Sequence, residues 1–163
     1  MSPVQKVVRH AETCAFRNQL PKRITELVER FDELTHTQRC RARSKMKRLQ
    51  LHERMARRAT EIASVNIGSA ERVIEAMIRI FGREATIAYL MEHNYTTKLL
   101  HRSERHKKHG DHRNAEILRA HVAHYFGEGE LLVFYEENRI AVRRKEPSNH
   151  ETLRRSRWGF ATA

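Results

Sequence analysis

The chain has 163 residues, enough for one compact domain or for a small domain with an extended arm. Lys and Arg number 32 against 20 Asp and Glu, a net charge of +12 that suggests a polyanionic partner and says nothing about fold. The two cysteines indicate neither a disulfide framework nor a thiolate metal site, and no apolar run is long enough for a membrane span or a secretory signal. We therefore expect a soluble, cytoplasmic protein, associated with the nucleoid or with ribonucleoprotein, that uses no cofactor.

Apolar residues at helical spacing dominate the N-terminal half. They predict a first helix over residues 4–15 that Pro21 ends, and a second helix from about Lys22. The second helix either continues through Thr35–Gln38 into the basic stretch or breaks there. Its apolar face fits a homodimer as well as an internal core. That face consists of Ile24, Leu27, Val28, Phe31 and Leu34.

Glycines and caps divide the middle of the chain. Gly68 separates two helices, Gly82 ends the second of them, and a short helix is expected around Glu84–Glu92. Asp111 then caps a further helix, which Gly127 stops. No internal repeat is evident.

The segment ELLVFYEENRIAVRRK changes the pattern. Two runs rich in β-formers flank Glu136–Asn138, which predicts a hairpin. The predicted fold class is mainly α, a helical domain with one C-terminal β-hairpin and a basic flexible tail. The predicted domains are residues 1–66, residues 67–146 and a tail of residues 147–163.

Positive charge is concentrated in three windows. Residues 37–60 hold nine bases and one acid, residues 98–119 hold seven and three, and residues 139–157 hold seven and two. In one continuous helix, six bases of the first window fall within an arc of about 100°. A solvated helix face is the alternative, but such a face usually carries both signs, so we favour phosphate contact. The six are Arg39, Arg43, Lys47, Arg54, Arg57 and Arg58.

The order helix, turn, helix, hairpin between Thr97 and Lys145 matches a winged helix-turn-helix. The helix Asp111–Phe126 would then enter the major groove of DNA, and the hairpin would contact phosphates. The alternative is a helix–hairpin unit that only completes a core. A second helix-turn-helix, at Glu61–Ile80, competes with an ordinary helical hairpin. Beyond the first window, the candidate nucleic-acid contacts are Arg105, Lys107, Lys108, Arg113, Arg119, Arg139, Arg143 and Arg144.

Histidines raise two other hypotheses. His106, His109 and His112 have i,i+3 spacing, which suits a metal, although few carboxylates and two lysines lie nearby. Arg119 and His124 have the R-x4-H spacing of some helical RNases, yet one such pair is no more than composition predicts. We therefore expect a nucleic-acid-binding protein, DNA before RNA, acting as a regulator or a packaging factor. A metal-independent RNase and a structural particle component are the alternatives.

Overall fold

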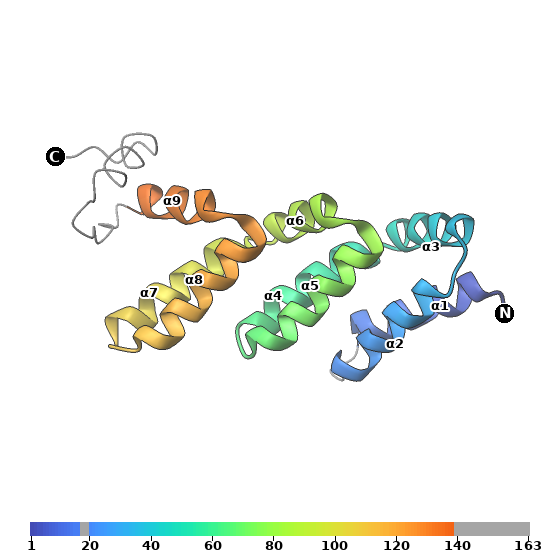
Figure 1. Ribbon diagram of the computed structural model, residues 1–163, viewed down its shortest axis with the longest axis horizontal. Helices are drawn as coiled ribbons and strands as arrows, with labels where there is room; N and C mark the ends of the chain where they lie inside the picture. Colours follow the sequence, from blue (N-terminus) through green and yellow to red (C-terminus); the bar gives the residue numbers. More distant parts are fainter. Residues whose placement is uncertain (17–19, 139–163) are drawn as a thin grey trace, which may run out of the picture. The chain divides into compact units, whose positions relative to one another are not determined.

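The computed structural model describes residues 1–16 and 20–138, and in that part of the chain it contains nine helices and no strand (Figure 1). Residues Met1–Leu131 form one compact unit, and the second unit begins at Leu132, within the last helix. The helices are α1 Pro3–Phe16, α2 Leu20–Asp32, α3 His36–Arg48, α4 Leu51–Ala63, α5 Ile67–Phe81, α6 Arg83–Glu92, α7 Tyr95–Lys108, α8 His112–Phe126 and α9 Glu128–Glu137.

The core of the first unit is built from helical hairpins. Short turns join α4 to α5 and α7 to α8, and each pair packs side by side (Figure 1). α5 also packs against α2, so apolar residues point from it in two directions. Its apolar stripe is wide enough to bury six side chains. The six are Ala70, Val73, Ile74, Ala76, Met77 and Ile80.

The predicted β-hairpin is wrong in the part that can be checked. Its first strand, residues 130–135, lies within α9, and so does most of the predicted turn. A short apolar run cannot be assigned to strand or helix by periodicity alone, and here the preceding turn decides. Gly127 ends α8 with φ 87° and ψ 160°, as Gly82 ends α5 with φ 91° and ψ 160°, and in both places a ten-residue helix follows. The second predicted strand, with Arg139, Arg143 and Arg144, lies outside the described residues.

The sequence shows no evident repeat, but in the structure the helices recur in groups of three. α4 and α7 both start after a residue in the left-handed conformation, Gln50 with φ 56° and Asn94 with φ 55°. α5 and α8 both start after an N-cap side chain that accepts a backbone N–H three residues on, Asn66 and Asp111. We therefore call α4–α6 repeat 2 and α7–α9 repeat 3. In α1–α3 two packed helices are likewise followed by a third, and we call this group repeat 1. In each repeat, the helices are called first, second and third.

Most predicted helix ends are confirmed, and two local assignments change. Pro21 does not end the first helix; it lies in the first turn of α2, where its missing N–H costs nothing. The second helix does break before the basic stretch, because Thr35 caps α3 with a capping box to Gln38. Ile24, Leu27, Phe31 and Leu34 are buried within the chain, so a homodimer would have to use other side chains.

Within the described residues, every helix is too short or too polar to cross a membrane.

Candidate nucleic-acid interface

The basic stretch is two helices and not one. α3 ends at Arg48, and Gln50 in the left-handed conformation redirects the chain into α4. The break follows from packing: α4 buries Leu51 and Met55 in the hairpin core, whereas α3 buries only Ala42 and Met46. The predicted single arc of six bases therefore does not exist, since it needs one uninterrupted helix.

Two of those six bases are structural. Arg39 donates from Nε to the carbonyl of Phe31 at 3.3 Å and from Nη2 to the carbonyl of Asp32 at 2.5 Å, which caps the end of α2. Its guanidinium lies 5.7 Å from the centre of the Phe31 ring, and that of Arg43 lies 5.8 Å from it. Both side chains are half-buried against α2, so neither is a free phosphate contact.

The outer face of α3 keeps a strong positive charge. The helix contains six bases and no acid. Arg41, Lys47 and Arg48 are exposed, and within the part of the chain that the structure describes none of them forms an ion pair. Arg41 and Lys45 are four residues apart, as are Arg43 and Lys47, and like charges at this spacing repel by a few tenths of a kcal/mol. An anion on this face would relieve that repulsion.

The bases of α4 lie on a separate helix. Arg54 and Arg57 are exposed. Arg58 is half-buried and pairs with Glu61 at 3.4 Å between Nη1 and Oε2. Of the six predicted contacts, the exposed side chains are therefore Lys47, Arg54 and Arg57.

The second window, residues 98–119, contains another basic cluster. Arg105, Lys107 and Lys108 occupy the last turn of α7, where cations also stabilise the negative end of the helix dipole. Arg113 is exposed in the first turn of α8. α7 and α8 pack as a hairpin, and no described strand forms a wing, so the winged helix-turn-helix gives no support for Arg113 as a base-reading residue.

The predicted catalytic pair is not assembled. Arg119 pairs with Glu116 at 3.0 Å between Nη2 and Oε2, whereas His124 is exposed and its ring packs 4.7 Å from the ring of Tyr125. Five residues of a helix turn through about 500°, which places the two side chains on different faces of α8. Nothing in this geometry brings an imidazole and a guanidinium to one phosphate.

The predicted histidine cluster has other partners. His106 lies 3.2 Å from Asp111 between Nδ1 and Oδ2, while Asp111 accepts the backbone N–H of Asn114 as the cap of α8. His109 follows α7 and His112 begins α8, and both are exposed. Across residues 1–16 and 20–138, no three His, Cys, Asp or Glu side chains come close enough to hold a metal ion.

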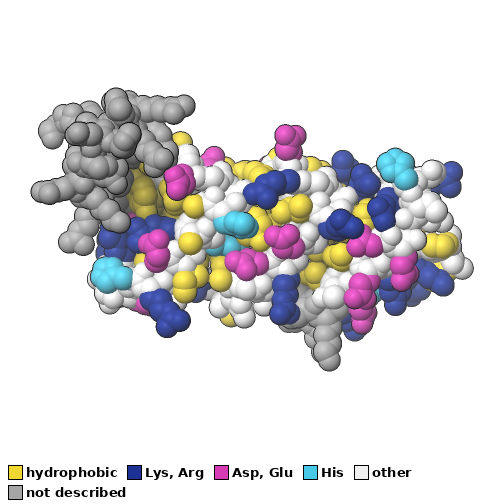
Figure 2. All heavy atoms as spheres, in the orientation of Figure 1, with side chains coloured by type: hydrophobic (Ala, Val, Ile, Leu, Met, Phe, Trp, Pro, Cys, Tyr) yellow, Lys and Arg dark blue, Asp and Glu magenta, His cyan; other side chains and the backbone are white. Residues whose placement is uncertain are grey.

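The second helices present a different surface. On the side drawn in Figure 2, acidic and basic side chains are interspersed. A groove of about 950 Å³ between α2 and α5 has walls of both signs, including Glu75 and Arg72. Arg79, also on its wall, pairs with Asp32 at 2.8 Å between Nε and Oδ1. Mixed charge of this kind offers a polyanion as much repulsion as attraction, so this groove does not extend the candidate interface.

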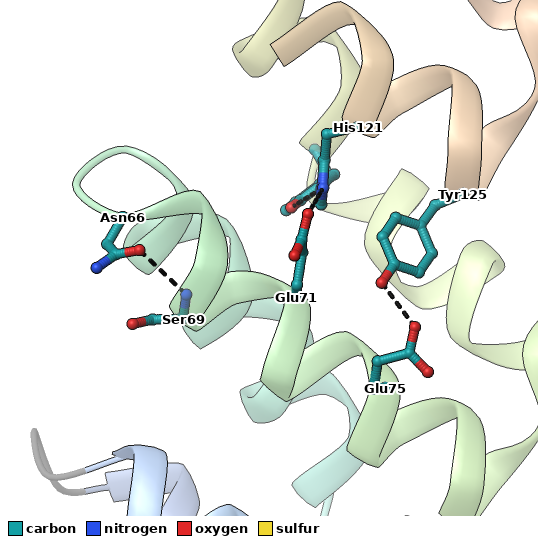
Figure 3. A network of polar contacts seen from close by, with 7 residues as sticks. Asn66, Ser69, Glu71, Glu75, His121 and Tyr125 are labelled. Carbon is teal, nitrogen blue, oxygen red and sulfur yellow. Dashed lines mark hydrogen bonds and ion pairs between the residues drawn. The ribbon is translucent and has the colours of Figure 1, made fainter. Parts of the chain in front are cut away.

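Polar contacts join α5 to α8. The Nδ1 of His121 lies 3.1 Å from Oε1 of Glu71, and the Nε2 lies 2.7 Å from the hydroxyl of Tyr95. The hydroxyl of Tyr125 donates to Oε1 of Glu75 at 2.6 Å (Figure 3). Tyr95 is fully buried and His121 is 4% exposed, so a substrate cannot reach the imidazole or the Tyr95 hydroxyl, whereas the Glu71 carboxylate lines the groove beside α5.

Burial sets the protonation of this network. It lowers the pKa of His121 below its ordinary value, although Glu71 acts in the opposite direction. Burial also raises the pKa of the Tyr95 hydroxyl, which therefore stays protonated. A neutral His121 can donate to Glu71 and accept from Tyr95, which satisfies all three groups. Sequence analysis missed this network, because His121 lies among the apolar residues of its helix and nothing in the sequence indicates its partners in α5 and α7.

Two further arginines hold helix ends. Arg102 donates to the carbonyl of Ala63 at 2.7 Å, at the end of α4. Arg83 donates to the carbonyls of His124 and Tyr125 at 3.1 and 3.4 Å, at the end of α8. With Arg39, they show that part of the arginine excess serves packing and not ligand binding.

Comparison with protein-family models, curated proteins and solved structures found no significant match to this chain. The assignment of the interface therefore rests on charge and geometry.

Proposed function

We propose that the protein binds nucleic acid through the phosphate backbone, with the outer face of α3 as the principal contact. The observation that supports this most directly is the composition of α3, six bases and no acid in thirteen residues. Only Ala42 and Met46 of the helix are buried, so packing does not account for the other positions. A helix that exists only to pack would carry compensating acids on its solvent face, as α2 and α5 do.

Charge chemistry favours phosphates as the ligand. Arg matches phosphate oxygens with a planar fork of donors, and Lys adds a point charge. The exposed side chains of α3 include no Phe, Tyr or Trp and no acid, so they can neutralise a backbone but have little with which to distinguish base edges. The binding we propose is therefore independent of sequence, as in a packaging or accessory factor, and a sequence-reading regulator is the weaker interpretation.

No specific observation favours either alternative function, a metal-independent RNase or a structural particle component. An RNase would need Arg119 and His124 at one phosphate, and they lie on different faces of α8. The preference for DNA over RNA depended on the winged arrangement, so we extend the proposal to duplexes of either kind.

Salt dependence tests this proposal. Affinity of the full chain for a labelled scrambled-sequence duplex, DNA or RNA, should fall steeply as salt rises, because each neutralised phosphate releases counterions. Fluorescence anisotropy at several salt concentrations gives the slope. Two duplexes of equal length but different base sequence should bind with the same affinity. An affinity that does not change between low and physiological salt, or the absence of binding at low salt, would overturn the proposal.

A further inference from the structure

A second group of bases lies next to the turn between α7 and α8. Arg105, Lys107 and Lys108 occupy the last turn of α7, and we call these three residues the tip cluster. Arg105 and Lys108 are exposed and Lys107 is half-buried. Across residues 1–16 and 20–138, none of the three forms an ion pair. The proposed function relies on α3, so it gives the tip cluster no role.

The fold of the hairpin does not require the tip cluster. α4 and α7 are the first helices of repeats 2 and 3, and each leads through a short turn to an N-cap, Asn66 or Asp111. The last turn of α4 carries no base, whereas that of α7 carries all three. Cations stabilise the C-terminal end of a helix, yet α4 packs into an equivalent hairpin without them. Bases this close together repel one another, and an anion bound there would relieve the repulsion.

The tip cluster and α3 lie at opposite edges of the first unit. The turns of repeats 2 and 3 share one edge, since Asn66 beside one turn and Asn114 beside the other line the same groove (Figure 1). At the opposite edge, Arg79 near the end of α5 pairs with Asp32 at the end of α2. α3 lies at this second edge, because its Arg39 bonds the last carbonyls of α2.

About one helix length separates the two edges. α5 runs from the first edge to the second, and its fifteen residues span about 22 Å. It also separates the repeats, because it packs against α2 and bonds α8 through Glu71. α3 packs its buried side chains against α1, α4 and α5, so its outer face is directed away from the hairpins. A straight duplex that lies on this outer face therefore does not reach the tip cluster.

We propose that the tip cluster is a second binding surface for duplex nucleic acid, and that the protein bridges two duplexes, or two segments of one, between this cluster and α3. The inference rests on the proposed function, since α3 holds the first duplex. Arg and Lys at the tip suit phosphate oxygens as those of α3 do. Residues 105–113 contain no Phe, Tyr or Trp on which unpaired bases could stack, which favours duplex over single strand. Bridging is what a packaging factor needs and a sequence-reading regulator does not.

A capture assay on the full chain tests the bridge. One duplex is immobilised on beads, and a second, fluorescent duplex of unrelated sequence can be retained only if the protein holds both. Wild-type protein at low salt should retain the second duplex. Retention should fall when protein is in large excess, because each duplex is then occupied by its own protein molecules. It should also fall as salt rises, since both surfaces contact phosphates.

Two variants with equal charge change separate the surfaces. The tip variant is Arg105→Glu, Lys107→Glu, Lys108→Glu, and the α3 variant is Arg41→Glu, Lys47→Glu, Arg48→Glu. Each should lower retention of the second duplex to the level seen without protein. In fluorescence anisotropy, the tip variant should still bind one duplex with a salt slope within about one unit of wild type.

A third variant controls for net charge. It reverses three exposed bases outside both surfaces and should retain the second duplex as wild type does. These changes are Arg30→Glu, Arg72→Glu and Lys98→Glu. Circular dichroism verifies folding, and Gln replaces Glu at the three tip positions if the tip variant unfolds.

The outcomes separate the bridge from the proposed function. If wild-type protein binds one duplex through α3 but retains no second duplex, the proposed function stands and the bridge is overturned. Retention by the tip variant equal to that of wild type would overturn the role of the tip cluster. Equal loss of single-duplex affinity in the two variants, without retention by wild type, would place both surfaces on one duplex and overturn the bridge. If wild-type protein binds no duplex at low salt, both proposals fail.

Discussion

α3 and α5 are of similar length, yet their sequences follow different constraints. α5 has fifteen residues, buries six of them, balances two acids with two bases, and uses Glu71 and Glu75 to bond α8. α3 has thirteen residues, buries two, and carries six bases with no acid. Almost every position of α5 is explained by what it touches inside the chain. Most exposed positions of α3 are not explained by contacts inside the chain. We therefore expect a ligand to bind at this face.

The largest effect should come from the core of α5. Ile74 is 1% exposed, and Ile74→Ala should lower the free energy of unfolding by about 2–5 kcal/mol, from lost burial and the cavity left behind. Urea denaturation measures it. The triple reversal of Arg41, Lys47 and Arg48 on α3 should change stability by less than about 0.5 kcal/mol, because these side chains are exposed. Equal losses in the two variants would remove the distinction between the helices.

The next effect concerns the bonds from α5 to α8. His121→Leu should lower the free energy of unfolding by about 1–3 kcal/mol, because the fully buried Tyr95 hydroxyl loses its partner. Tyr125→Phe is a useful comparison, since it removes a hydroxyl whose partner, Glu75, is exposed to water. A loss for His121→Leu no greater than that for Tyr125→Phe would contradict a buried structural role.

His121 should also shape the response to acid. Burial lowers the pKa of His121 in the folded chain, so below an ordinary histidine pKa the unfolded chain binds more protons and stability falls with falling pH. His121→Leu should flatten that decline below about pH 6.5. The pKa of His52 is lowered as well, also by burial, but His52 is present in both proteins, so the difference between them isolates His121. Parallel pH profiles for wild type and variant would contradict this assignment.

The smallest effect distinguishes two arginines of α3 itself. Arg39→Ala should cost about 1 kcal/mol of stability, because it removes the donors to the last carbonyls of α2 and the contact with Phe31. Arg41→Ala, two residues away and exposed, should leave stability within about 0.5 kcal/mol of wild type. In duplex binding the order should reverse, with Arg41→Ala weaker than Arg39→Ala. A larger loss of stability for Arg41→Ala, together with a larger loss of duplex affinity for Arg39→Ala, would contradict the structural role of Arg39 and the binding role of Arg41.

Helix boundaries were largely predictable because local chemistry determines them. Asp111 at a cap, Gly82 and Gly127 at helix ends, and the apolar periodicity of α5 all act through neighbouring residues. The segment after Gly127 was not predictable in the same way, since ELLVF suits a strand as well as a helix. What favours a helix for this segment is that it occupies the same place in repeat 3 as α6 does in repeat 2. The two repeats resemble each other in geometry far more than in residue identity, so the sequence alone did not show this.

The candidate site was predicted by charge and corrected by packing. Nine bases between residues 37 and 60 set this region apart in the sequence, but the sequence did not show that Gln50 would divide it. Nor did it show that Arg39 would bond carbonyls of α2, because that contact depends on where the preceding helix ends.

If the outer face of α3 holds a phosphate backbone, charge reversal there should change the salt dependence of binding more than charge reversal elsewhere. The salt slope of duplex binding is compared between the triple variant Arg41→Glu, Lys47→Glu, Arg48→Glu and the matched second-helix variant Arg30→Glu, Arg72→Glu, Arg113→Glu. Both remove the same charge, so any general effect of net charge is shared. We expect the α3 variant to lower the slope by about three units and the second-helix variant to change it by less than about one. Equal slopes in the two variants would show that net charge alone governs binding, and would contradict the assignment to α3.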